Sequence, residues 1–184
     1  NRNSLLFRDS TVDGIKTGHT TAAGYCLVAS AVRGDMRLVS VVMGASSEEA
    51  RARGSQKLLA YGFRYFETAQ LYKAGEALKQ VRVWGGQDDS IRLGLPEDLF
   101  LTITRGSREG LKANINLAKE IHAPISKGDK LGTLVVSTPE GEKTTMPLKG
   151  LKSIEESGFL GRWFDSFVLF FLKLTGGDPL EFSQ

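Results

Sequence analysis

The segment Val12–Thr20 carries the side chains best suited to chemistry, because Lys16, Thr17, Gly18 and His19 follow one another in it. On the edge strand of a sheet, a Lys-Thr-Gly tripeptide places an ammonium group and a hydroxyl beside a residue without a side chain, so that another chain can approach the strand backbone closely. We therefore expect this strand to bind an extended peptide and its terminal carboxylate. Taken alone, the tripeptide also fits a glycine-terminated surface turn.

The composition describes an ordinary globular chain. Of its 184 residues, 41% are hydrophobic and 24% charged, which is enough for one domain or two small ones. The net charge is +3, but Lys and Arg are interspersed with Asp and Glu, which argues against nucleic acid as a partner. The single cysteine, Cys26, excludes an internal disulfide, and with only His19 and His122 it cannot complete a zinc set. We expect no metal and no cofactor.

Two apolar runs follow the tripeptide, Tyr25–Val32 and Leu38–Met43, and a Gly-Asp turn separates them. Runs rich in Val on either side of such a turn predict a β-hairpin. A lone hairpin cannot bury both of its faces, so we expect a further N-terminal part of the same protein to complete this fold.

A helix is expected after the hairpin. Ser46 can cap its free N–H groups while Glu49, three residues on, completes a capping box, and the helix ends near Phe66. Spacing of 3.6 residues gives this helix a predicted buried face. Its members are Ala50, Gly54, Leu58 and Tyr61.

The pattern changes between residues 67 and 150 to short β-branched or alternating runs, separated by turns rich in Gly, Pro and Asp. This spacing predicts a small all-β sandwich or barrel as a second domain. The expected strands are Gln80–Trp84, Ser90–Leu93, Leu99–Thr104, Leu111–Leu117, Lys130–Ser137 and Lys143–Leu148.

Residues 151–184 form a third part, a linker followed by an amphipathic helix. The apolar run is too short and too charged to cross a bilayer, but its aromatic rings suit the headgroup boundary. We expect it to contact the membrane surface; a core helix packed on the β domain and an oligomerisation helix are the alternatives. The expected membrane contacts are Phe159, Trp163, Phe164, Phe167, Phe170 and Phe171.

Three segments in the same order resemble low-molecular-weight penicillin-binding proteins of the serine-type D-alanyl-D-alanine carboxypeptidase family. Val12–Thr20 and the strand after it resemble the family's third active-site motif, Ile121–Gly132 resembles its C-terminal β domain, and the closing aromatic helix is similar too. The resemblance implies the α/β edge of a penicillin-binding/β-lactamase-like (transpeptidase) domain over residues 1–66, an all-β sandwich domain over 67–150 and a membrane-anchor helix within 151–184.

The resemblance also implies roles for individual residues. Lys16 would join the active-site hydrogen-bond network and contact the substrate carboxylate, and Thr17 would donate its hydroxyl to the same carboxylate. The backbone N–H of His19 would serve the oxyanion hole, while its ring would shape the rim of the cleft. Gly18 would leave room for the incoming D-alanine.

The family's nucleophile belongs to a Ser-x-x-Lys motif and a Ser-x-Asn motif follows it, but the sequence contains neither. We expect both motifs to lie before Asn1, so that this chain alone is inactive while the intact protein removes D-alanine from peptidoglycan stem peptides and is acylated by β-lactam antibiotics. The resemblance implies a place on the periplasmic face of the bacterial inner membrane and a part in cell-wall synthesis and cell shape. A non-catalytic membrane-tethered interaction module, an endopeptidase and a β-lactamase are the alternatives.

Overall fold

The computed structural model describes residues 2–141, 143–158, 167–170 and 179–180. The chain forms two compact units, Asn1–Ala69 with Leu101–Glu109, and Gln70–Phe100 with Gly110–Gln184. Each unit has its own core. The predicted domain boundaries after residues 66 and 150 stay predictions.

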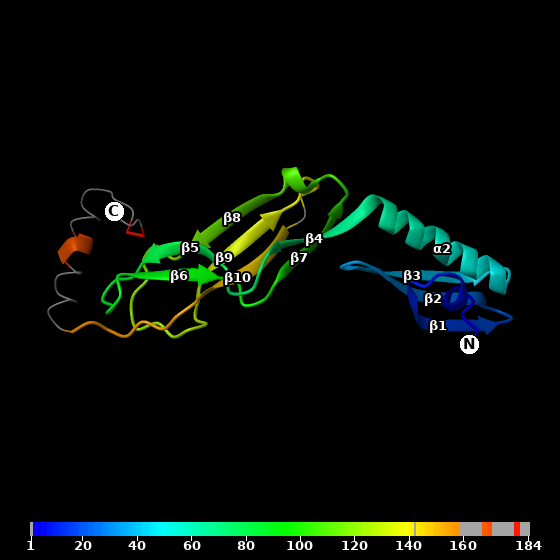
Figure 1. Cartoon of the computed structure of the whole chain (residues 1–184), viewed down its shortest axis with the longest axis horizontal. Coiled ribbons are helices and arrows are strands. Elements are labelled where there is room, and N and C mark those ends of the chain that lie inside the picture. Colours follow the sequence, from blue (N-terminus) through cyan, green and yellow to red (C-terminus); the bar gives the residue numbers. More distant parts are fainter. Residues whose placement is uncertain (1, 142, 159–166, 171–178, 181–184) are drawn as a thin grey trace. The chain divides into compact units, whose positions relative to one another are not determined.

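The first unit is a three-stranded antiparallel sheet in the order β1-β2-β3, and helix α2 lies along one face of it (Figure 1). The predicted hairpin is confirmed as β2 and β3. Gly34 in its turn has a φ of 57°, a backbone conformation that glycine adopts without steric cost. The elements are α1 (Leu5–Arg8), β1 (Val12–Thr20), β2 (Gly24–Arg33), β3 (Met36–Ala45) and α2 (Glu48–Tyr65).

The cap of α2 differs from the prediction by one residue. Ser47, not Ser46, is the N-cap: its backbone is extended and its side chain accepts a hydrogen bond from the Ala50 N–H at 3.1 Å. Glu49 therefore occupies the second helical position rather than the third, so the predicted capping box is wrong. Its carboxylate instead pairs with Arg8 at 2.9 Å.

The predicted buried face of α2 is also wrong, since Leu58 is 50% exposed and Tyr61 is 59% exposed. Consecutive helical residues are about 100° apart around the axis, so a shift of one residue moves the buried stripe to another side. Small residues on the observed face let the helix approach the sheet closely; a Cβ on Gly62 would collide with Leu38. The buried residues are Arg51, Ala52, Ser55, Leu59, Gly62 and Phe63.

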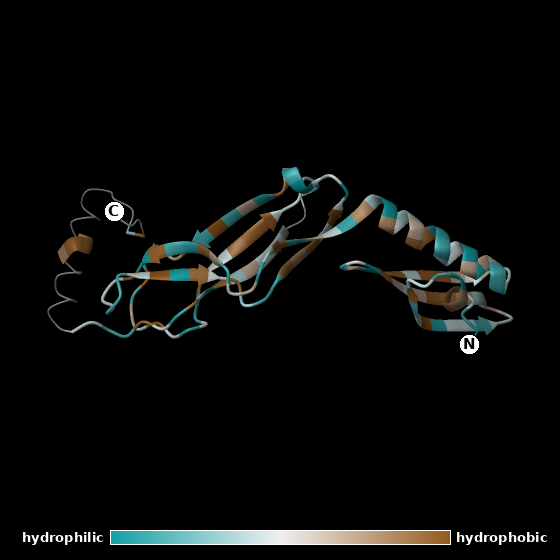
Figure 2. Ribbon diagram, in the orientation of Figure 1, coloured by the Kyte–Doolittle hydropathy of each residue, from teal (hydrophilic) through white to brown (hydrophobic). Residues whose placement is uncertain are grey.

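The second unit is rich in β-structure, as predicted, and its main sheet is antiparallel in the order β5-β6-β10-β9-β8. Apolar residues alternate along these strands (Figure 2), and those that point inward form its core, where Ile91 on β6 and Leu134 on β9 are at most 1% exposed; Trp84, which follows β5, is equally buried. Its strands are β5 (Ala77–Arg82), β6 (Ser90–Gly94), β8 (Lys112–Leu117), β9 (Lys130–Ser137) and β10 (Lys143–Gly150).

A two-stranded sheet pairs β4 (Phe66–Tyr72) with β7 (Leu99–Thr104), and a short 3-10 helix, η1 (Arg108–Gly110), follows β7. The β4 strand was not predicted, whereas β7 has its predicted bounds.

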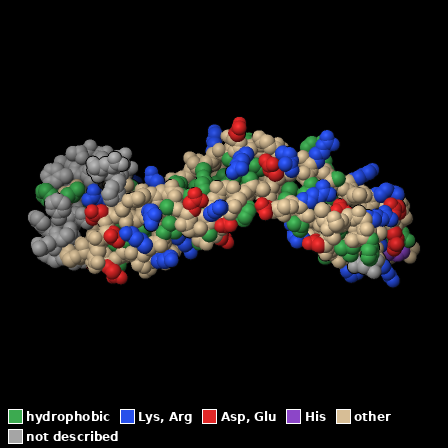
Figure 3. Space-filling view, in the orientation of Figure 1, with side chains coloured by type: hydrophobic (Ala, Val, Ile, Leu, Met, Phe, Trp, Pro, Cys, Tyr) green, Lys and Arg blue, Asp and Glu red, His purple; other side chains and the backbone are tan. Residues whose placement is uncertain are grey.

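Figure 3 shows Lys and Arg side chains interspersed with Asp and Glu on the face in view.

Only part of the predicted membrane helix falls within the described residues. Residues 167–170 are helical, with Phe167 53% and Phe170 60% exposed and Leu169 buried. The other expected contacts, Phe159, Trp163, Phe164 and Phe171, lie outside the described residues. Among the helices that the structure describes, none combines the length and apolar character needed to cross a membrane.

Candidate active site on strand β1

Strand β1, which carries the Lys-Thr-Gly tripeptide, is an edge strand of the described three-stranded sheet. It pairs antiparallel with β2, so that Thr17 lies opposite Leu27, Gly18 opposite Cys26 and His19 opposite Tyr25. The other edge of β1 has no neighbour among the described strands. The expected alignment of a peptide along this edge stays a prediction.

The side chains of the tripeptide point to two different faces. Thr17 and His19 share the α2 side of the sheet with Leu27 and Tyr25, and the His19 ring packs on the Tyr25 ring with centroids 4.0 Å apart. Lys16 pairs with Val28 and lies on the opposite face; its Nζ donates to the Thr17 carbonyl at 2.9 Å.

A hollow of about 410 Å³ opens beside the strand. Three of its lining side chains, Arg2, Lys16 and Arg51, are cationic, and Glu48 is the one carboxylate among the described lining residues. Such a surplus of positive charge beside a hydroxyl favours a small anion such as a carboxylate. The lining residues are Arg2, Ile15, Lys16, Thr17, Gly18, His19, Glu48 and Arg51.

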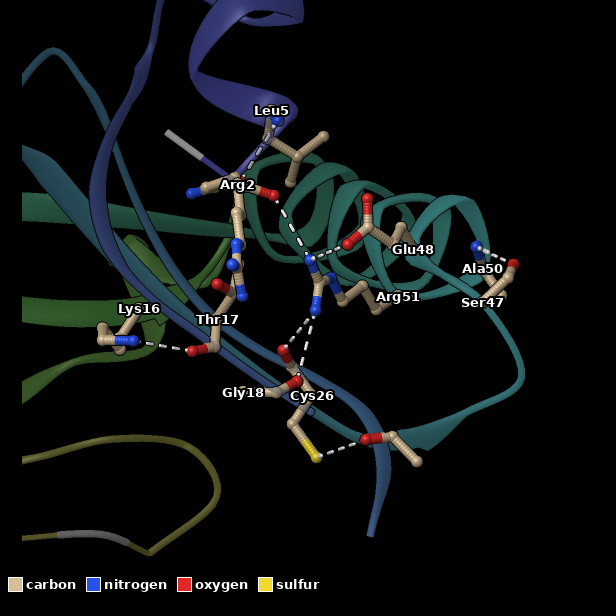
Figure 4. Close-up of polar contacts among 12 residues, drawn as sticks. Arg2, Leu5, Lys16, Thr17, Gly18, Cys26, Ser47, Glu48, Ala50 and Arg51 are labelled. Atoms are coloured by element: carbon tan, nitrogen blue, oxygen red, sulfur yellow. Dashed lines mark hydrogen bonds and ion pairs between the residues drawn. The ribbon is translucent and has the colours of Figure 1, made fainter. Parts of the chain in front are cut away.

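Sequence reasoning missed Arg2, Ile15, Glu48 and Arg51 among the lining residues, and Arg51 is the most buried of them. Its side chain is only 3% exposed, and its guanidinium donates to the carbonyls of Gly18 at 3.2 Å, Cys26 at 3.4 Å and Arg2 at 3.2 Å (Figure 4). It also contacts the Glu48 carboxylate at 3.3 Å. A single side chain of α2 thus joins β1, β2 and the N-terminal segment. No sequence signal marks it, because an arginine in a charged helix usually faces solvent.

Gly18 has no local structural need to be glycine. Its φ is not positive, and a Cβ built on it would meet only the Cβ of Cys26, at an ordinary 3.8 Å. The absence of a side chain is therefore better explained by something outside the described chain that approaches the strand here.

Two family models match the chain. The model described as "Penicillin-binding protein 5, C-terminal domain" matches residues 66–156, and that described as "D-alanyl-D-alanine carboxypeptidase" matches residues 1–47, which include the tripeptide. D-alanyl-D-alanine carboxypeptidase DacA of Escherichia coli K12 is 44% identical over 173 residues, or 93% of this chain. The chain belongs to the D-alanyl-D-alanine carboxypeptidase family.

Other members of this carboxypeptidase family are similar to the chain over most of its length. DacF of Bacillus subtilis is 35% identical over 99% of the chain. The crystal structure of penicillin-binding protein 5 from Haemophilus influenzae superposes with a TM-score of 0.75 at 41% identity, covering 85% of this chain and 46% of that one. The chain spans less than half the length of these relatives, 43% for DacA and 45% for DacF.

Proposed function

We propose that this chain is the C-terminal portion of a serine-type carboxypeptidase that removes the terminal D-alanine from peptidoglycan stem peptides. The observation that carries the proposal is the cationic hollow beside β1, where the Thr17 hydroxyl and the ammonium and guanidinium groups of Lys16, Arg2 and Arg51 surround space for a carboxylate. A substrate ending in D-Ala-D-Ala presents such a carboxylate next to its scissile amide.

The tripeptide supplies binding and electrostatic stabilisation in this scheme. Thr17 donates its hydroxyl to the terminal carboxylate, and Lys16 adds positive charge to the hydrogen-bond network around the reacting group. The backbone N–H of His19 donates to the oxyanion of the tetrahedral intermediate; losing one such donor typically lowers the rate on the order of 10²–10³-fold.

The nucleophile belongs to the N-terminal part of the same protein, which we place on the uncovered face of the sheet. On the face opposite α2, Val39 and Val41 are each 56% exposed and Met43 is 76% exposed, although all three lie in a central stretch of β3. An apolar sheet face normally packs against another layer. The relatives have more than half of their length beyond the matched region, enough to supply that layer.

Catalysis then follows the acyl-enzyme route. The serine of the N-terminal part attacks the D-Ala-D-Ala amide, D-alanine leaves, and water hydrolyses the ester. A β-lactam mimics the substrate and acylates the same serine, and the reaction stalls at this acyl-enzyme.

The C-terminal segment attaches the enzyme peripherally to the periplasmic face of the inner membrane; exposed Phe167 and Phe170 support this attachment.

The test is release of D-alanine from a synthetic stem pentapeptide by the full-length protein. We expect release by the wild type and a loss on the order of 10²-fold for Lys16→Ala, with Lys57→Ala, a change at an exposed lysine of α2, as the matched control. Cleavage of an internal cross-link without release of terminal D-alanine would contradict the proposal in favour of an endopeptidase, and preferential turnover of penicillin would favour a β-lactamase.

A further inference from the structure

Strand β1 contains a β-bulge between Val12 and Gly14, on the N-terminal side of the tripeptide. Val12 lies opposite Ala31 on β2, but the next aligned pair is Gly14 with Ser30, so two steps on β1 match one step on β2. Asp13 is the extra residue. Bulges of this kind re-aim the side chains that follow them and occur often beside active sites.

The bulge decides which face each residue of the tripeptide occupies. Val12 is buried in the core on the α2 side. Side chains alternate along a strand, so without an extra residue Lys16 would share that side and Thr17 would face away. With Asp13 inserted, Thr17 lies opposite Leu27 on the α2 side and Lys16 lies opposite Val28 on the other.

Three side chains from three strands hold the bulge. The Arg37 guanidinium on β3 donates to both carboxylate oxygens of Asp13, at 3.0 and 2.8 Å, and the same nitrogen donates to the hydroxyl of buried Ser30 on β2. Arg37 first and Ser30 second hold the pKa of the Asp13 carboxyl below its usual range. We call Asp13, Ser30 and Arg37 the bulge clamp.

The clamp is poorly placed to serve stability alone. The side chains of Arg37 and Asp13 are 54% and 48% exposed, and exposed ion pairs contribute little to folding. The clamp acts locally instead, because it fixes the backbone of β1 at Asp13, three residues before Lys16.

We propose that the bulge clamp is a positioning device that sets Lys16 and Thr17 on opposite faces of the sheet. Lys16 then leaves the strand on the side where the N-terminal part with its nucleophile packs and borders the hollow from there, whereas Thr17 borders the hollow from the α2 side. This inference rests on the proposed function and adds Asp13, Ser30 and Arg37 to it as positioning residues. None of the three lines the hollow beside β1.

The experiment measures acylation of the full-length protein by a fluorescent penicillin as a function of penicillin concentration, which separates the limiting rate from the half-saturating concentration. The variants are Asp13→Ala, Arg37→Ala, the double variant and the swapped pair Asp13→Arg with Arg37→Asp. The control is Arg8→Ala, which breaks another exposed Arg–carboxylate pair of the same unit, with Glu49 at 2.9 Å. Thermal unfolding of each variant is recorded alongside.

We expect each single variant to lower the limiting rate by about tenfold or more, since small misplacements of catalytic groups cost up to about 10²-fold. The double variant should lose no more than either single one, because both changes break one device, and the swapped pair should recover part of the rate. The control should acylate like the wild type.

Wild-type limiting rates in both single variants, or losses that multiply in the double variant, would overturn the inference. So would rates that fall only in proportion to the unfolded fraction. A wild-type protein that is not acylated at all would instead contradict the proposed function, and the inference with it.

Discussion

The guanidinium of Arg51 donates to the carbonyl of Gly18 across 3.2 Å, so helix α2 holds the backbone of the strand that carries the tripeptide. The same side chain reaches the carbonyl of Cys26 on the neighbouring strand. The position of β1 at the candidate site therefore depends on a buried residue 33 positions further along the chain than Gly18.

Replacing Arg51 should damage both fold and site. Arg51→Ala leaves three carbonyls without their donor, and we expect a loss of about 3 kcal/mol in the free energy of unfolding together with loss of penicillin acylation. Urea unfolding of the full-length protein measures the change in the free energy of unfolding. Arg53→Ala is the matched control, because Arg53 lies two residues further along the same helix with its side chain 60% exposed and should change stability by less than about 0.5 kcal/mol. Equal effects of the two changes would contradict this assignment.

Glycine substitutions should separate function from folding. Gly18→Ala meets no obstacle in the described chain, so the unfolding midpoint should stay near that of the wild type while acylation falls sharply; Gly18→Val should abolish acylation. Gly24 on the same sheet has a φ of +64° and lies close to the carbonyl of Ala45. Gly24→Ala should therefore lower the free energy of unfolding by about 1–2 kcal/mol. Normal acylation of Gly18→Val would show that nothing approaches the strand there.

Acid should release the bulge clamp. The pKa of the Asp13 carboxyl is lowered in the folded protein by Arg37 and then by Ser30, so its stabilising effect is complete above the unfolded-state pKa and is lost as the pH falls through the lowered folded-state pKa. The difference in unfolding free energy between the wild type and Asp13→Asn should therefore be constant near neutral pH and disappear in strong acid. Chemical denaturation across the acid range measures it; a difference that grows on acidification has the wrong sign.

The membrane proposal has a direct test on vesicles. Full-length protein should sediment with liposomes, whereas a form that ends at Gly158 should stay in the supernatant, because attachment depends on the apolar side chains beyond that point. Phe167→Ser with Phe170→Ser should weaken binding in the intact protein. Since the segment carries few cations, raising the salt concentration should have little effect, and release by salt would point to electrostatic attachment instead.

Sequence reasoning located the parts that depend on local pattern. The bounds of β7 and β9 and the hairpin of β2 and β3 follow from alternation and turn chemistry, which the structure confirms. The N-cap was missed by one residue, because Ser46 and Ser47 are adjacent and either type can cap a helix. The burial of Arg51 and the exposure of Leu58 depend on tertiary contacts, since strand carbonyls accept the hydrogen bonds of Arg51. The bulge at Asp13 likewise leaves no local signature, since it exists only relative to the register of β2.

Labelling with a fluorescent penicillin, followed by denaturing electrophoresis, tests the central claim most directly. The full-length protein should carry covalent label and the 184-residue chain alone should not, because we propose that the nucleophile lies in the preceding part of the protein, whereas the tripeptide lies in this chain. Lys16→Ala in the full-length protein should reduce the label strongly. If neither the full-length protein nor this chain is labelled, the Lys-Thr-Gly strand has no acyl-transfer role and the carboxypeptidase account is contradicted.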